Sequence, residues 1–213
     1  MTDKVIKEQL VHTIMDLYRA GLITEKGGNI SVRSIERKNA VYITPTRINK
    51  GTLQAEQLIL IDMDGRKIEG RNRPSIECKY HAGIMKARPK INAVIHTHAP
   101  YATVFGMIDM EIPPIAVEAV FIKDYPKVLF FIPGSDDLTN AVLEKLAHSQ
   151  VLGAFLQNHG LITLGKDLQS AAEKTMMVEH TLKILFALKN TGLEPSLISK
   201  KDVEFLSKLT NVI

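Results

Sequence analysis

Two histidines, His96 and His98, end an apolar run in the stretch NAVIHTHAP, residues 92–100. The run is typical of a buried strand, on which side chains two positions apart point to the same face, on the order of 6–7 Å from each other. Neutral imidazole is the commonest protein ligand for zinc and similar divalent ions. The pair is therefore interpreted either as two ligands of a metal site or as two incidental polar residues at a strand end.

His159 is a third candidate ligand. It follows an apolar segment in the sequence QNHG, and the adjacent Gly160 would allow the backbone to approach closely. Together His96, His98 and His159 predict a three-histidine zinc site whose fourth position stays open for water or substrate. The remaining histidines are interpreted as helix-surface or core-edge residues: His12, His81, His148 and His180.

The elements that must position these histidines alternate between helical and strand patterns. Strand-like segments joined by polar turns predict two hairpins, the second about Asp64-Gly65. Residues 111–135 are rich in proline and are interpreted as loop, with the run VLFFI (128–132) buried among them. We therefore expect an α/β or α+β chain whose sheet is rich in antiparallel strands. The expected helices are 4–22, 74–89, 100–107, 135–149, 168–189 and one from about 201, and the expected strands are 29–34, 40–45, 58–61, 93–98, 151–160 and 161–165.

The composition is typical of one globular domain, residues 1–213. The chain is 45% hydrophobic and 23% charged. No apolar run approaches the roughly 18–20 residues of a membrane span, and the charged start MTDKVIKEQL lacks the apolar segment of a signal peptide. The single cysteine, Cys78, fits a reducing compartment, so we expect a cytoplasmic protein. The formal charge of +4 is scattered, which favours an ordinary solvated surface, compatible with a small anionic substrate, over nucleic-acid binding.

Five segments together resemble the class II aldolase/adducin family, and within it the L-fuculose-phosphate aldolase branch. They are GGNISVR, ITPT, EGRNRPSIECKYH, AVIHTHAPYATVFG and NHGLITLGKDLQSAAEKTMMVEHT, between about residues 5 and 190. The resemblance implies a single α/β (α+β-like) domain with a central, mostly antiparallel sheet flanked by helices. It implies that His96, His98 and His159 bind Zn²⁺, or another divalent metal such as Mn²⁺ or Co²⁺, with Glu77 beside the metal. It further implies a homotetramer with sites at subunit interfaces.

The function implied by the resemblance is a lyase that cleaves a carbon–carbon bond of a small sugar phosphate or related hydroxy-ketone. Retro-aldol cleavage passes through an enediolate, whose charge a zinc ion held by three neutral histidines can stabilise. Removing the α-proton needs a base within hydrogen-bond reach, which is the role implied for Glu77. The alternative interpretation of Glu77 is a glutamate in the first turn of a helix, favourable to the helix dipole.

Three other functions stay open on the same fold. A metal-dependent decarboxylase of a small hydroxy or keto acid would keep the metal and the enediolate but release carbon dioxide. A sugar-phosphate epimerase is less favoured, because that branch carries aspartate where this chain has Glu77. A non-catalytic, adducin-like module is disfavoured, because a scaffold has no physical need for a glutamate and three histidines that converge.

Three loops carry the residues expected to hold the substrate's anionic group by small side chains and backbone amides. The residues that match the family here are Gly28, Asn29, Thr46 and Ser75. Lys26, Arg47 and Ile76 replace the threonine, glycine and serine that are usual beside them. Arginine can bind a carboxylate or a phosphate in two-point fashion, so Arg47 joins the predicted substrate-binding residues. The equally favoured alternative is that the charges of Lys26 and Arg47 simply face solvent. Whether the anchored group is a phosphate or a carboxylate is left open.

Overall fold

The computed structural model describes residues 2–209, and within them eight strands form one sheet. The strands are β1 Asn29–Arg33, β2 Ala40–Ile43, β3 Ile59–Asp62, β4 Lys67–Glu69, β5 Ala93–Thr97, β6 Lys127–Val128, β7 Gly153–Leu156 and β8 Gly160–Gly165. Their order across the sheet is β4-β3-β2-β1-β5-β8-β7-β6. Every neighbouring pair is antiparallel except β6 and β7, which run parallel. The expectation of a mostly antiparallel central sheet is confirmed.

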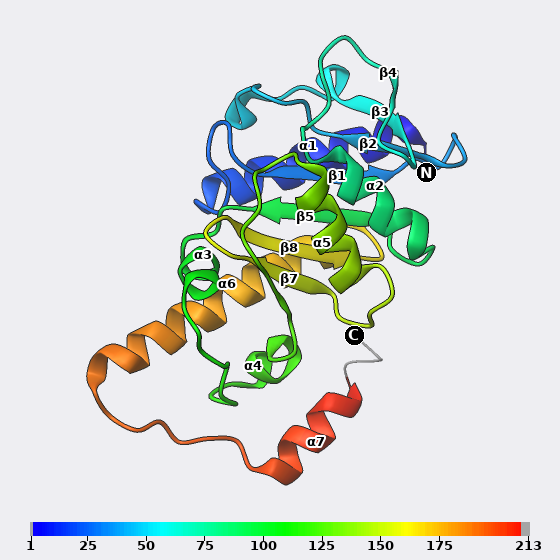
Figure 1. Ribbon diagram of the computed structural model, residues 1–213. Helices are drawn as coiled ribbons and strands as arrows, with labels where there is room; N and C mark the ends of the chain where they lie inside the picture. The colour runs from blue at the N-terminus through cyan, green and yellow to red at the C-terminus, as the bar shows by residue number, and fades with distance from the viewer. Residues whose placement is uncertain (1, 210–213) are drawn as a thin grey trace.

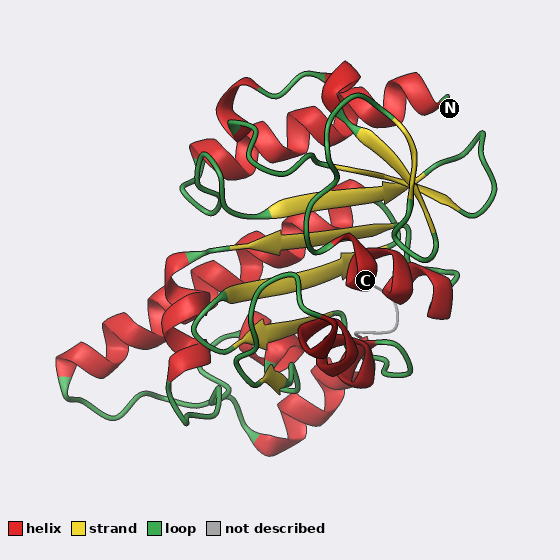
Figure 2. Cartoon of the chain, turned by 45° about the horizontal axis from the view of Figure 1, so that its top comes forward, coloured by secondary structure: helices red, strands yellow, loops and turns green. Residues whose placement is uncertain are grey.

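Helices cover both faces of the sheet (Figures 1 and 2). They are α1 Asp3–Arg19, α2 Cys78–Ala87, α3 Pro100–Met107, α4 Val117–Ile122, α5 Asp136–Leu146 and α6 Leu168–Thr191. A seventh helix, α7 Lys200–Leu209, packs against α4 and lies apart from the sheet (Figure 1). The core on one face is built with α1, α3, α4 and α6, and the core on the other face with α2 and α5. No helix within residues 2–209 is long and apolar enough to cross a membrane.

The alternation of side chains along β5 decides which face carries the chemistry. Ile95 belongs to the core beneath α1 and α6, whereas Val94 belongs to the core beneath α2 and α5. His96 lies two positions after Val94 and therefore points to the α2 side of the sheet. The strand is buried throughout, so His96 is held at a fixed place in the sheet.

The helix expected over 74–89 begins later, at Cys78. The residues before it pair with a neighbouring loop instead: the Ser75 amide donates to the carbonyl of Thr44, and the Thr46 amide donates to the carbonyl of Arg73. An isolated bridge between Pro45 and Pro74 joins the same two loops. These backbone hydrogen bonds hold two of the predicted anion loops side by side and delay the start of the helix.

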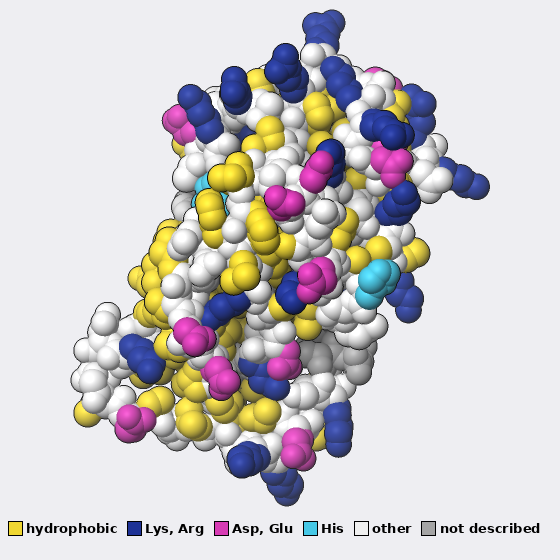
Figure 3. Space-filling model, viewed as in Figure 1, with side chains coloured by type: hydrophobic (Ala, Val, Ile, Leu, Met, Phe, Trp, Pro, Cys, Tyr) yellow, Lys and Arg dark blue, Asp and Glu magenta, His cyan; other side chains and the backbone are white. Residues whose placement is uncertain are grey.

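Residues 111–135 differ from the expectation in two respects. They contain the short helix α4 and the edge strand β6, and the run 128–132 that was expected to be buried is largely exposed. Leu129 is 69% exposed and Ile132 is 67% exposed. The reason is that β6 ends at Val128, so the chain leaves the sheet before the remaining apolar side chains can pack. Figure 3 shows exposed apolar side chains gathered over the middle and the lower left of the face in view.

The domain expected from the sequence, residues 1–213, includes Met1 and residues 210–213, which lie outside the described residues.

Candidate metal centre and active site

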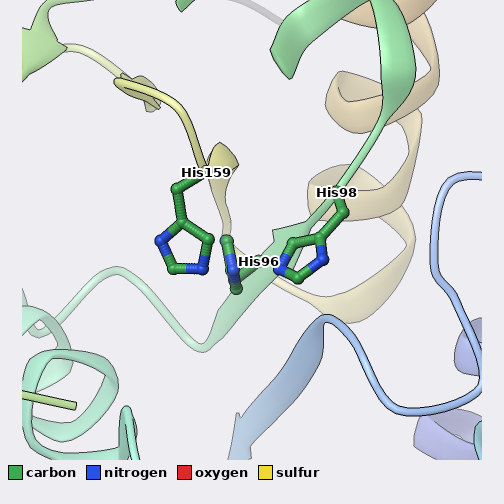
Figure 4. Close-up of side chains that lie close together, drawn as sticks. All are labelled: His96, His98 and His159. Atoms are coloured by element: carbon green, nitrogen blue, oxygen red, sulfur yellow. The ribbon is translucent and has the colours of Figure 1, made fainter. Parts of the chain in front are cut away.

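The three candidate histidines converge on one point (Figure 4). His96 lies in β5 and His98 directly follows it, whereas His159 lies in the turn between β7 and β8. Their ring centroids are 4.6 to 5.1 Å apart. One ligand nitrogen from each imidazole can be chosen so that all three lie within 4.8 Å of one another. This spacing allows three nitrogens to contact a single ion.

Two glycines make the convergence possible. A Cβ atom on Gly160 would overlap the carbonyl oxygen of Thr97, so the turn that carries His159 can approach β5 only with glycine there. A Cβ atom on Gly27 would lie 2.5 Å from Nδ1 of His98. The close backbone approach expected at Gly160 is thus confirmed, and the loop around Gly27 comes equally close on the other side.

Hydrogen bonding and burial leave the histidines ready to act as ligands. Nδ1 of His96 lies 3.1 Å from the carbonyl of Leu161, which can only accept, so the proton is on Nδ1 and the lone pair is on Nε2. Burial lowers the pKa of His96 to about 4 and lowers the pKa of His98 and of His159 below the ordinary value. All three rings are therefore neutral at pH 7, the form that binds a metal.

Buried atoms at this point lack hydrogen-bond partners among residues 2–209. Two of them are Nε2 of His96 and Oε1 of Glu77. Buried polar atoms are nearly always paired, and leaving one unpaired costs roughly 1–3 kcal/mol. A divalent cation would take up such lone pairs, and imidazole nitrogens with a carboxylate oxygen are ligands that zinc accepts. The donor set fits a divalent metal.

Glu77 faces the histidines rather than capping its helix. It occupies the N-cap position of α2 but makes no capping hydrogen bond. Its Oε2 lies 3.6 Å from Nε2 of His96, and its Oε1 lies 3.8 Å from Nε2 of His159. Burial opposes ionisation, but the facing His96 and a hydrogen bond from Asn29 outweigh it and hold the Glu77 pKa below its ordinary value. The side chain is placed as an ionised base beside the candidate ligands, which disfavours the helix-dipole interpretation.

The predicted anion-binding residues lie on loops around Glu77. The Ser75 hydroxyl accepts a 3.3 Å hydrogen bond from the Glu77 amide. Gly28 has φ +78°, and a Cβ atom there would lie 2.9 Å from the carbonyl oxygen of His96. Arg47 is exposed and adopts φ +59°, in the region that favours glycine. The structure thus brings Ser75 and Gly28 against the centre and leaves the Arg47 side chain in solvent, beside Thr46.

His81 departs from the interpretation as a helix-surface or core-edge residue, because it is fully buried. Its Nε2 is hydrogen-bonded to Oδ1 of Asn29, and its Nδ1 lies 2.7 Å from Oγ of Ser31. The spacing of these residues in the sequence could have indicated that His81 faces the site. Glu77, the N-cap residue of α2, is four residues before His81 in that helix, and Asn29 and Ser31 are two apart on β1, so each pair lies on one side of its element.

A family model described as Class II Aldolase and Adducin N-terminal domain matches residues 8–186. This match spans most of the chain, which therefore belongs to the class II aldolase and adducin family. Together with the relatives below, it makes the protein an enzyme of the metal-dependent aldolase type.

Similar proteins carry more than one activity in their names. An L-fuculose phosphate aldolase of Methanococcus maripaludis (strain C5) is 34% identical over 177 residues, which cover 83% of this chain and 93% of the relative. A 3-oxo-tetronate 4-phosphate decarboxylase of Haemophilus influenzae is 32% identical over 197 residues, covering 89% and 90%. The crystal structure of YgbL from Klebsiella pneumoniae is 26% identical, with a TM-score of 0.87 over 97% of this chain and 99% of that one.

Proposed function

We propose that the protein is a zinc-dependent lyase that cleaves a carbon–carbon bond of a small ketose phosphate by retro-aldol chemistry. The observation that carries the proposal is the ionised, 4% exposed Glu77, which faces three converging neutral histidines. His96, His98 and His159 would hold the metal. When bound, the cation would supply a fixed positive charge for the oxygen that becomes negative as the bond breaks.

Glu77 would move the proton. In the donor half-reaction its carboxylate would take a proton from the hydroxymethyl carbon of a phosphorylated hydroxy-ketone, and in the cleavage direction it would return that proton to the same carbon. Oε2 is engaged by Asn29 at 2.7 Å, which leaves Oε1 as the oxygen for this task.

The substrate's anion would bind on the three loops beside Glu77. Gly28 offers a backbone amide, and Thr46 and Ser75, whose own amides are used between the loops, offer small hydroxyls; the close packing of these loops supports that role. The Asn29 amide uses one of its two Nδ2 hydrogens on Glu77, so the other can be donated to the substrate. Arg47 would add a guanidinium at the open side of this anion site.

A second candidate is a decarboxylase of a phosphorylated keto acid on the same site. Arg47 is the observation that favours it. A left-handed arginine costs about 1 kcal/mol or more relative to glycine, so its presence points to a contact that repays the strain, such as a substrate carboxylate. The 32% identity to a decarboxylase supports the same class of substrate. An epimerase, with its aspartate, and a non-catalytic module stay less favoured.

We also propose a single catalytic domain over residues 1–213, a homotetramer and a cytoplasmic location. The exposed apolar run 128–132 supports a subunit interface, since exposed apolar patches mark contact sites. The single cysteine, a buried free thiol, supports a reducing compartment.

The two enzyme candidates are separated by their products. Metal-loaded protein is incubated with ketose 1-phosphates, and dihydroxyacetone phosphate is detected by coupled reduction with NADH. A parallel incubation with 3-oxo acid 4-phosphates measures released carbon dioxide. The aldolase proposal expects dihydroxyacetone phosphate from at least one ketose 1-phosphate and none from protein stripped of metal. Carbon dioxide release without aldol cleavage would replace it with the decarboxylase.

A further inference from the structure

A chain of buried hydrogen bonds runs from β1 to Glu77 through α2. The Ser31 hydroxyl lies 2.7 Å from Nδ1 of His81, the other ring nitrogen of His81 bonds to Oδ1 of Asn29, and Nδ2 of Asn29 lies 2.7 Å from Oε2 of Glu77. Ser31 and His81 are fully buried, and Asn29 is 7% exposed. Four polar side chains in a core therefore end at the proposed catalytic carboxylate.

The chain has only one consistent direction of donors. An ionised carboxylate can only accept, so the Asn29 amide turns its Nδ2 to Glu77 and its Oδ1 to His81. Oδ1 also only accepts, so His81 must carry its proton on Nε2. Nδ1 then holds a lone pair, to which the Ser31 hydroxyl donates. Burial lowers the pKa of His81 to about 3, so the ring stays neutral and can fill both roles at once.

We infer that His81 and Ser31 are positioning residues for Glu77: they fix the orientation of the Asn29 amide and thereby hold Oε2 of the carboxylate, leaving Oε1 to exchange protons. The inference rests on the proposed function of Glu77. Without Ser31, His81 could move its proton to Nδ1. The Asn29 amide would then face a bare Nε2, and turning its NH₂ group toward that nitrogen would take the donor away from Glu77.

If Ser31 and His81 only filled space in the core, apolar side chains would do so equally well. Buried polar groups contribute little net stability when they are paired and destabilise the fold when they are unpaired. Tyr80 stacks on His81 with ring centroids 4.8 Å apart and fixes the plane of the imidazole. A buried chain of polar side chains is explained if Glu77, at its end, must keep Oε2 fixed by a hydrogen bond and Oε1 free.

The hydrogen-bond chain is tested by NMR on zinc-loaded protein with ¹⁵N-labelled histidine and asparagine. In the wild-type protein we expect His81 to keep its proton on Nε2 from about pH 6 to 9. In Ser31→Ala we expect part of the population to move that proton to Nδ1. We also expect the side-chain amide resonance of Asn29 to shift, although two hydrogen bonds separate Ser31 from Asn29. A wild-type proton on Nδ1, or an Asn29 amide that ignores Ser31→Ala, would overturn the inference.

A matched pair of variants adds a functional readout. His81→Gln still offers a donor to Asn29, whereas His81→Met fills similar space without one. Hydrogen exchange at dihydroxyacetone phosphate should slow about tenfold or more in His81→Met, with metal content and KM unchanged, and His81→Gln should recover most of that loss. Equal losses in both variants would overturn the positioning role. If the wild-type protein exchanges no hydrogen, the proposed function fails, and the two NMR signals still decide on the hydrogen-bond chain.

Discussion

Asn29 and Glu77 stand 48 positions apart in the sequence and are joined by a 2.7 Å hydrogen bond inside the protein. The bond exists because Asn29 is the direct cross-strand neighbour of His96 in the β1–β5 ladder, on the face that α2 covers. The pairing of Asn29 with His96 therefore places Glu77, the candidate base, next to His96, a candidate metal ligand. It also makes the two oxygens of Glu77 different, one held and one without a partner among residues 2–209.

Removal of single histidines should strip the metal. His96→Ala and His159→Ala each delete one of three converging nitrogens, so we expect metal content to fall from about one ion per chain to near zero, with the fold kept. Elemental analysis and circular dichroism measure the two effects. His148→Ala, at an exposed histidine just after the end of α5, is the control and should keep its metal. Full metal occupancy in His96→Ala would contradict the ligand assignment.

Arg47 separates backbone strain from substrate binding. Arg47→Gly relieves the positive φ and removes the charge, whereas Arg47→Ala removes the charge and keeps the strain. We expect both variants to raise KM roughly tenfold with little change in turnover, and only the glycine variant, which relieves the strain, to unfold at a higher denaturant concentration than the wild type. Unchanged KM values in both variants would show that the guanidinium faces solvent and does not contact the substrate.

Lys50 predicts a pH dependence of stability. Its side chain is 2% exposed and donates to the carbonyls of Pro45 and Ile48, next to Thr46 in the loop proposed to bind the anion. Burial lowers its pKa from 10.5 to about 8. Between these values the unfolded chain binds more protons than the folded one, so the Lys50 contribution to stability rises as the pH rises from 8 to 10.5.

Urea unfolding across that pH range measures the Lys50 effect. We expect the difference in unfolding free energy between the wild type and Lys50→Met to change with pH in favour of the wild type. Lys38→Met, at an exposed lysine, should leave the pH profile of the wild type unaltered. A Lys50→Met profile parallel to that of the wild type would show that the buried ammonium titrates normally.

Local periodicity was enough to predict the core of the site. The two-residue spacing of His96 and His98 put both on one strand face, and the glycine after His159 indicated close backbone approach; the structure has both features. The mostly antiparallel sheet followed from the hairpin signals in the same way. These features are determined by residues close together in the sequence, so they can be predicted without the structure.

The features that were missed depend on contacts between distant segments. The four-residue spacing puts Glu77 and His81 on one face of the helix, but His81 was interpreted as a helix-surface or core-edge residue because the helix alone does not reveal which face packs on the sheet. The run 128–132 was interpreted as buried because its composition is apolar, but the two-residue strand β6 ends before most of it can pack. The late start of α2 follows from pairing between the loops around Pro45 and Pro74, which no local pattern indicates.

The most direct test of the proposed chemistry is proton–deuterium exchange at the hydroxymethyl carbon of dihydroxyacetone phosphate, followed by NMR on zinc-loaded protein. It isolates the step assigned to Glu77 and needs no knowledge of the aldehyde. We predict exchange in the wild type and a loss on the order of 10²–10⁴-fold in Glu77→Gln, with its metal retained. Absence of exchange in metal-replete wild-type protein, or undiminished exchange in Glu77→Gln, would contradict the assignment.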